Sequence, residues 1–238
     1  MAPVRAKDGV DLRTNWPNCP HGLTLQAVVR RFGPLPAGRV VHVLRQLCGA
    51  LAEAHASGLV HRDLKPGNIL VARLGGVCDV AKLLDFGLVL DETAADAGDR
   101  LTRAGVVLGT PAYMAPEQAA GEPVDARGDV YSLGAVAYYT LTGRPPFQGK
   151  SALQVMAAHR TLPAPSLDGA PADLAAVVAR CLAKDPTDRF PTAGDLERAL
   201  AGCGCAPDWS AERAAAWWAG LAGGGAPPTS SGPTCTFG

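Results

Sequence analysis

The sequence lacks an excess of charge of either sign. Its 238 residues contain 22 Lys and Arg against 22 Asp and Glu, so the formal net charge is zero. Proteins that bind nucleic acid through general electrostatic attraction usually carry a basic excess. We therefore expect no nucleic-acid partner.

The sequence also lacks an apolar run long enough to span a membrane. The longest apolar stretch, residues 130–143, has 14 residues, whereas a membrane span needs about 20. Residues 1–20 contain no apolar core typical of a secretory leader. The last 25 residues, from Ala214 onward, carry no charge and are rich in Gly, Pro, Ser and Thr. We expect a cytoplasmic protein without a membrane span, in which residues 130–143 form a buried helix.

The cysteines show neither the even count nor the regular spacing of a disulfide framework. The seven lie at positions 19, 48, 78, 181, 203, 205 and 235. Cys203-Gly-Cys205 and Cys19-Pro-His21 suggest metal ligands, but they lack the paired spacing of structural zinc sites. The spacing favours free thiols over zinc ligands.

The periodicity of apolar residues predicts a mainly α protein with a few short β-strands. Helices are expected over residues 25–32, 37–57, 127–141, 151–159, 171–183, 192–200 and 210–221. Strands are expected over residues 59–60, 69–71 and 80–84, and a polar loop over 91–103. Gly33 and Gly58 stand where the first two helices should end.

Three motifs follow one another in the middle of the chain. Residues 61–68 read HRDLKPGN and match all five fixed positions of the pattern H-R-D-L-x-x-x-N. Asp85-Phe86-Gly87 begins 17 residues after Asn68, and residues 109–117 read GTPAYMAPE. Alone, Asp-Phe-Gly would indicate only a turn, but the order and spacing of the three motifs indicate a shared function.

Through these motifs the chain resembles the C-terminal lobe of a bacterial, eukaryotic-like serine/threonine protein kinase, over about residues 22–202. The resemblance implies the kinase α+β fold without its N-terminal β-sheet lobe, with ATP, Mg²⁺ and a protein substrate. It assigns Asp63 as catalytic base, Lys65 to the transferred phosphate, and Asn68 and Asp85 to Mg²⁺. A lysine at position 65 is typical of kinases that act on Ser or Thr.

The resemblance also implies structural roles. Glu117 and Arg189 correspond to a buried ion pair under the activation segment. Asp129 corresponds to a carboxylate that accepts backbone N–H groups of the catalytic loop. His61 and Phe86, the latter followed by Gly87 of the metal-binding motif, correspond to stacked side chains that link the base loop to the metal loop.

Two threonines are candidates for substrate positioning and regulation. Thr110 corresponds to the substrate-platform threonine that bonds the catalytic Asp and Lys. Thr102 lies eight residues earlier, and Arg62 resembles an arginine that reads a phosphate in that segment. Phosphorylation of Thr102 would then order the segment by pairing with arginine. The alternative is that Thr102 is an ordinary loop residue.

The upper half of a kinase active site is not found in the sequence. No G-x-G-x-x-G is present, and the first glutamate of the chain is Glu53. Only 22 residues precede Leu23, whereas five strands and a helix with their turns need roughly 55–60 residues. We expect a truncated kinase domain that is weak or inactive alone, or one whose N-lobe functions come from a partner.

The expected organisation has three parts. Residues 1–22 form an irregular segment, residues 23–202 the kinase C-lobe, and residues 203–238 a helix and a flexible tail. In that helix Trp217 and Trp218 are expected to pack on the lobe, with a partner-binding site as the alternative. A non-catalytic interaction module is the alternative function. Small-molecule phosphotransfer is less favoured, because relatives with that activity usually lack the A-P-E element.

Overall fold

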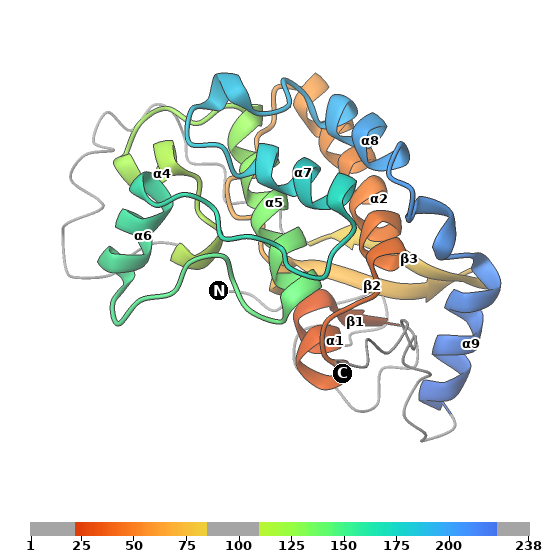
Figure 1. Ribbon diagram of the computed structural model, residues 1–238. Coiled ribbons are helices and arrows are strands. Elements are labelled where there is room, and N and C mark those ends of the chain that lie inside the picture. Colours follow the sequence, from red (N-terminus) through yellow and green to blue (C-terminus); the bar gives the residue numbers. More distant parts are fainter. Residues whose placement is uncertain (1–21, 85–109, 223–238) are drawn as a thin grey trace, which may run out of the picture.

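The computed structural model describes residues 22–84 and 110–222, which form a mainly helical body with one small sheet (Figure 1). The helices are α1 (Leu25–Phe32), α2 (Ala37–Ala56), α4 (Pro116–Ala120), α5 (Ala126–Thr142), α6 (Ala152–Thr161), α7 (Ala172–Cys181), α8 (Ala193–Ala201) and α9 (Ala211–Ala222). Short 3-10 turns add η1 (Pro66–Asn68), η2 (Pro111–Tyr113), η3 (Pro186–Asp188) and η4 (Ala206–Asp208). The predicted fold class, mainly α with a few short strands, is confirmed. The loop expected over 91–103 and the tail expected after residue 222 lie outside the described residues.

The sheet has three antiparallel strands in the order β1 (Gly22–Thr24), β2 (Ile69–Leu74) and β3 (Val77–Leu83). Residues 69–71 and 80–84 were predicted as strands; the structure extends the first to Leu74, and it begins the second earlier, at Val77, and ends it at Leu83. Sequence patterns missed β1, since three residues are too few to show an alternation. Both α2 and α9 pack against β3. The catalytic-loop motif, residues 61–68, lies between the end of α2 and the start of β2.

The end of α2 corrects the strand expected over residues 59–60. Gly58 has a left-handed backbone, with φ of 77°, and its N–H donates to the His55 carbonyl at 2.9 Å. The N–H of Leu59 donates to the Ala54 carbonyl at 3.0 Å. These two bonds are those of a Schellman cap. Because the cap uses the Leu59 N–H and leaves that side chain 52% exposed, residues 59–60 continue the helix end and join no strand.

Helix α5 is the centre of the helical layer. Every residue from Gly128 to Thr140 is buried, so the helix has no polar face. It packs against α2, α7 and α8, as Figure 1 shows for its neighbours α2 and α7. Gly134 permits the close approach to α7, because a Cβ at this position would lie 2.5 Å from the Cβ of Cys181. The predicted buried helix is present, and among the described helices none has the length and hydropathy of a membrane span.

The C-terminal helix α9 lies beside the sheet in Figure 1 and packs against β3. Trp217 and Trp218 are both buried. The ring of Trp217 makes an edge contact with Phe32, at 5.1 Å between centroids. The prediction that these indoles pack a terminal helix on the domain is confirmed.

Candidate active site

The acidic side chain of Asp63 is the centre of the catalytic loop. The Lys65 Nζ lies 2.6 Å from Asp63 Oδ2, and the Asn68 amide donates to the same oxygen at 3.1 Å. Asn68 also donates to the main-chain carbonyl of Asp63 at 3.0 Å. The Asp63 side chain remains 38% exposed. The loop thus presents a fixed carboxylate to solvent, with a cation beside it.

A second carboxylate, Asp129 of α5, holds the backbone of this loop from below. It is 1% exposed and accepts the N–H of His61 at 2.8 Å and the N–H of Arg62 at 2.9 Å. Arg62 has φ of 61°, a left-handed conformation that costs a non-glycine residue about 1–2 kcal/mol. The bonds from Asp129 help to stabilise that conformation. The loop contact expected for Asp129 is present.

Two further side chains secure the loop, and the motifs did not identify them. His55 of α2 contacts Asp129 Oδ2 through Nε2 at 2.8 Å. Gln118 of α4 donates its amide to the Arg62 carbonyl at 2.8 Å. His55 had one sequence signal, as a polar residue on the apolar stripe of its helix. No sequence pattern pointed to Gln118, because α4 is too short to show a period.

His61 is fully buried beside Asp63. Burial lowers the pKa of its imidazole below the ordinary value of 6.5, so the ring is neutral near pH 7. The N–H of Asp63 points at His61 Nδ1, at 3.3 Å. The expected partner Phe86 lies outside the described residues.

Glu117 and Arg189 form the buried ion pair that the sequence predicts. Their two parallel bonds, Nη1 to Oε1 and Nη2 to Oε2, are both 2.8 Å. Arg189 also donates to the carbonyls of Ala183, Lys184 and Arg127 at 2.9–3.0 Å. This arginine therefore joins α4, the start of α5 and the segment after α7.

The orientation of Asn68 is compatible with a magnesium ligand. The side-chain amide nitrogen of Asn68 faces Asp63, so the side-chain oxygen Oδ1 is turned away from that residue. Hard divalent cations prefer oxygen ligands. In the stretches 22–84 and 110–222, no group of three His, Cys, Asp or Glu side chains could hold a metal. The other expected ligand, Asp85, lies outside the described residues with Gly87. Asp85 directly follows Leu84, whose N–H donates to the main-chain carbonyl of Asn68 at 2.7 Å.

Thr110 is the first described residue of the second described stretch, immediately before η2. Its side chain is exposed. The hydrogen bonds found between described residues do not connect its hydroxyl to Asp63 or Lys65, which pair with each other. The platform role of Thr110 stays a prediction, and Thr102 lies outside the described residues.

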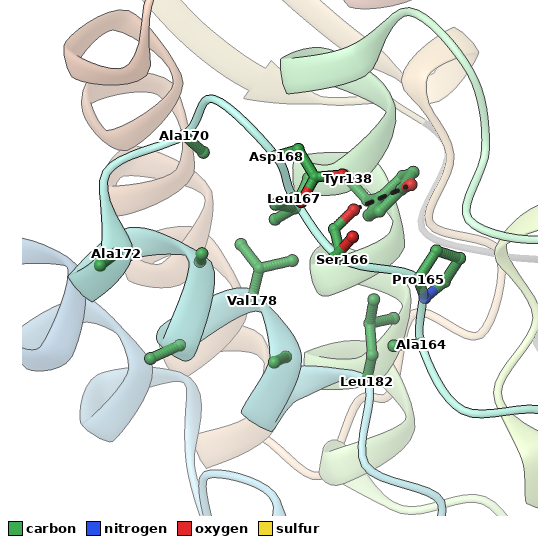
Figure 2. Close-up of a pocket in the computed structure, with 13 residues that line it drawn as sticks. Tyr138, Ala164, Pro165, Ser166, Leu167, Asp168, Ala170, Ala172, Val178 and Leu182 are labelled. Carbon is green, nitrogen blue, oxygen red and sulfur yellow. Dashed lines mark hydrogen bonds between the residues drawn. The ribbon is translucent and has the colours of Figure 1, made fainter.

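A separate hollow of about 440 Å³ lies between α5, α7 and the segment that joins α6 to α7. Figure 2 shows its walls, which consist mainly of small apolar side chains with Val178 and Leu182 on one side. Across it the Tyr138 hydroxyl lies 3.5 Å from the Ser166 carbonyl. None of the predicted site residues lines this hollow.

The chain matches known protein kinases. Residues 17–199 match the protein kinase domain family. Serine/threonine-protein kinase PknB of Mycobacterium tuberculosis is 43% identical over 183 residues, which are 75% of this chain and 28% of that protein. Serine/threonine-protein kinase Pkn1 of Myxococcus xanthus is 47% identical over 171 residues, 70% of this chain and 24% of that protein. This chain thus spans about a quarter of the length of these relatives.

The fold comparison agrees. The crystal structure of the Mycobacterium tuberculosis PknI kinase domain superposes with a TM-score of 0.56 and 28% sequence identity. The match covers 75% of this chain and 60% of that one.

Proposed function

The chain belongs to the protein kinase family as a serine/threonine kinase homologue, and we propose that it transfers the γ-phosphate of ATP to a serine or threonine hydroxyl of a protein substrate. The observation that carries this proposal is the geometry around Asp63, an exposed carboxylate fixed by Lys65 at 2.6 Å and Asn68 at 3.1 Å.

In the proposed reaction Asp63 accepts the proton of the substrate hydroxyl. The hydroxyl oxygen forms a bond to the γ-phosphorus while the bond from that phosphorus to the bridging oxygen breaks, and ADP leaves. Lys65 places its positive charge where the transferred phosphoryl group passes. Most of the rate enhancement in this chemistry comes from such positioning and charge stabilisation.

For magnesium we propose the carbonyl oxygen of Asn68 and the carboxylate of Asp85. Bound Mg²⁺ neutralises charge on the β- and γ-phosphates. Asp63 sets the direction of the side-chain oxygen of Asn68, because the Asn68 amide nitrogen donates both to the main-chain carbonyl and to the carboxylate of Asp63. We further propose Thr110 as substrate platform, and Thr102 as a phosphorylation site that Arg62 recognises.

The test is phosphate transfer from Mg-ATP to a generic basic protein, followed by identification of the modified amino acids. We expect phosphoserine and phosphothreonine without phosphotyrosine. Lys65→Met should lower kcat by at least about 100-fold, the scale of losing one charge-stabilising group. Lys150→Met, on the exposed segment before α6, is the matched control and should leave kcat unchanged.

Two outcomes would contradict the proposal. One is absence of transfer both from this chain and from a version extended upstream along its gene. The other is phosphotyrosine as the main product. Failure of Mg-ATP to raise the unfolding temperature, together with absence of transfer, would favour the non-catalytic interaction module.

A further inference from the structure

A buried carboxylate in β3 has a backbone conformation that strands do not normally contain. Asp79 has φ of 56° and is fully buried. The register between β2 and β3 shifts here, because Ala72 pairs with Val80 while Leu74 pairs with Val77. The strand β3 therefore has one residue more than its partner in this stretch, which is a β-bulge. Bulges turn a side chain away from the strand's alternation.

Four N–H groups bind the two carboxylate oxygens of Asp79. Arg39 of α2 donates to Oδ2 through Nε at 2.8 Å and to Oδ1 through Nη2 at 2.7 Å. The indole of Trp209 donates to Oδ2 at 2.9 Å, and that of Trp218 to Oδ1 at 2.6 Å. Half of the bonds to this buried charge thus come from residues beyond 202. We call Asp79, Arg39, Trp209 and Trp218 the Asp79 cluster.

The C-terminal segment also encloses the arginine. The Arg39 guanidinium carbon lies 3.8 Å from the centroid of the Trp217 ring and 4.9 Å from that of Trp209. Such cation–π contacts strengthen when water is excluded, and Arg39 is 1% exposed. Trp217 contacts the arginine by its face but donates no hydrogen bond to Asp79. This difference separates its role from that of Trp218.

Helix α2 fixes the same point of the strand through the main chain. The Asp79 carbonyl accepts the Gln46 amide at 2.9 Å, and His42 Nε2 lies 3.3 Å from it. Gln46 also accepts the N–H of Ala81 at 3.1 Å. The bulge is therefore held on one side by α2 and on the other by the segment that ends in α9.

The far end of β3 contacts the catalytic loop directly. Leu83 pairs with Ile69, and the N–H of Leu84 donates to the Asn68 carbonyl at 2.7 Å. Leu84 lies five positions after Asp79 in the chain, about 16 Å at the rise of a strand. Because β3 is fixed at the bulge, the position of Leu84, the residue before Asp85, is constrained as well.

We propose that the Asp79 cluster is a positioning device for the active site. It makes residues 203–222, beyond the end of the family match at residue 199, a working part of the catalytic domain. The cluster holds β3 in the register that keeps Leu84 bonded to Asn68. Its effect on nucleotide binding rests on the proposed function, whereas its effect on the Leu84–Asn68 contact does not.

The test compares Trp218→Phe with Trp217→Phe in the full chain. Each variant keeps an aromatic ring and loses one indole N–H, but of these two indoles only that of Trp218 donates to Asp79. Backbone hydrogen exchange is measured at Leu84, with residues 130–140 of α5 as internal reference. In Trp218→Phe we expect Leu84 to exchange about tenfold faster than in Trp217→Phe, the effect of losing one hydrogen bond to a charged group. Trp209→Phe, which removes the indole donor to the other carboxylate oxygen, should change exchange in the same direction.

Equal exchange at Leu84 in the two variants would overturn the proposal. So would an increase at Leu84 that matches the increase in α5, because that pattern indicates only a general loss of stability. The dissociation constant of Mg-ATP, measured well below the unfolding temperature, should weaken in Trp218→Phe by more than in Trp217→Phe. If the unaltered chain neither binds Mg-ATP nor transfers phosphate, alone or extended upstream, the proposed function fails, and the exchange experiment still decides the positioning role.

Discussion

The catalytic loop and the bulge in β3 contain Arg62 and Asp79, the two non-glycine residues with positive φ among residues 22–84 and 110–222. In each region a buried carboxylate stabilises the conformation. In the loop the carboxylate comes from outside, since Asp129 binds the backbone of the strained residue. In the bulge the strained residue carries the carboxylate itself, and distant side chains bind it. Backbone strain of this kind persists only where the surroundings determine it fully, and here both regions support one active site.

A buried arginine is paired with a carboxylate in the Asp79 cluster, and another, Arg189, is paired with Glu117 of α4, the helix whose Gln118 bonds the catalytic loop. Breaking these pairs should give the largest effects. Arg189→Met and Arg39→Met each leave a buried charge without its main partner, which costs about 3–5 kcal/mol. We expect the greater loss for Arg189→Met, because Arg189 also donates to three carbonyls. In contrast, Asp79 keeps two indole donors when Arg39 is lost.

The measurement is the free energy of unfolding in urea. Arg45→Met is the matched control, since the Arg45–Glu197 pair is largely exposed and its loss should cost at most about 1 kcal/mol. A loss for Arg39→Met as small as the control would show that the Asp79 cluster contributes little to stability.

Acidification should lower the stability of the domain through His159, which lies close to Arg189. His159 of α6 is fully buried, with Nδ1 2.8 Å from the hydroxyl of Tyr131, and Arg189 lies over the Tyr131 ring. Burial, and then the charge of Lys184, lowers the pKa of His159 from 6.5 to about 4. The unfolded state therefore takes up a proton as pH falls through about 6.5, while the folded state does so only near pH 4. The free energy of unfolding should fall across this window, by up to about 3 kcal/mol.

Urea unfolding at pH 7 and pH 4.5 checks this expectation. His159→Gln should lower stability at pH 7 and make the difference between the two pH values smaller. An unchanged difference would show that His159 is not the residue responsible.

Sequence patterns predicted the catalytic loop better than the Asp79 cluster, for a physical reason. The loop chemistry uses residues at fixed short spacing, so Asp63, Lys65 and Asn68 could be assigned from one motif. Asp129 and the Glu117–Arg189 pair came from the same resemblance, and the structure contains their contacts. The side chains that bind Asp79 come from residues 40, 130 and 139 positions away in the chain. No periodicity reports such pairings, and neither Asp79 nor Arg39 was predicted.

The strand expected over residues 59–60 shows a further limit of the sequence. Two apolar residues before a polar loop resemble a short strand, but the cap of α2 takes the Leu59 N–H first. A cap that satisfies backbone groups locally prevails over a two-residue propensity for strand.

A smaller effect should separate strain from charge in the two regions. Arg62→Gly and Arg62→Ala both remove the side chain, but only glycine adopts positive φ freely, so the glycine variant should be more stable by about 1 kcal/mol. Asp79→Gly should likewise be more stable than Asp79→Ala by about 1 kcal/mol. Both variants should be much less stable than the unaltered chain, because Arg39 loses its partner. Equal stability of the Gly and Ala variants at either site would show that the left-handed backbone carries no strain there.

The most direct test of the phosphotransfer assignment is the effect of Asp63→Asn on catalysis and on binding. This change keeps the size of the side chain and removes the carboxylate that is proposed to accept the substrate proton. We predict that kcat for phosphate transfer falls by at least about 100-fold, the scale of losing a general base, while the dissociation constant of Mg-ATP changes by less than about threefold. A kcat within about threefold of the unaltered chain would contradict the assignment of Asp63 as the base, and with it the proposed mechanism.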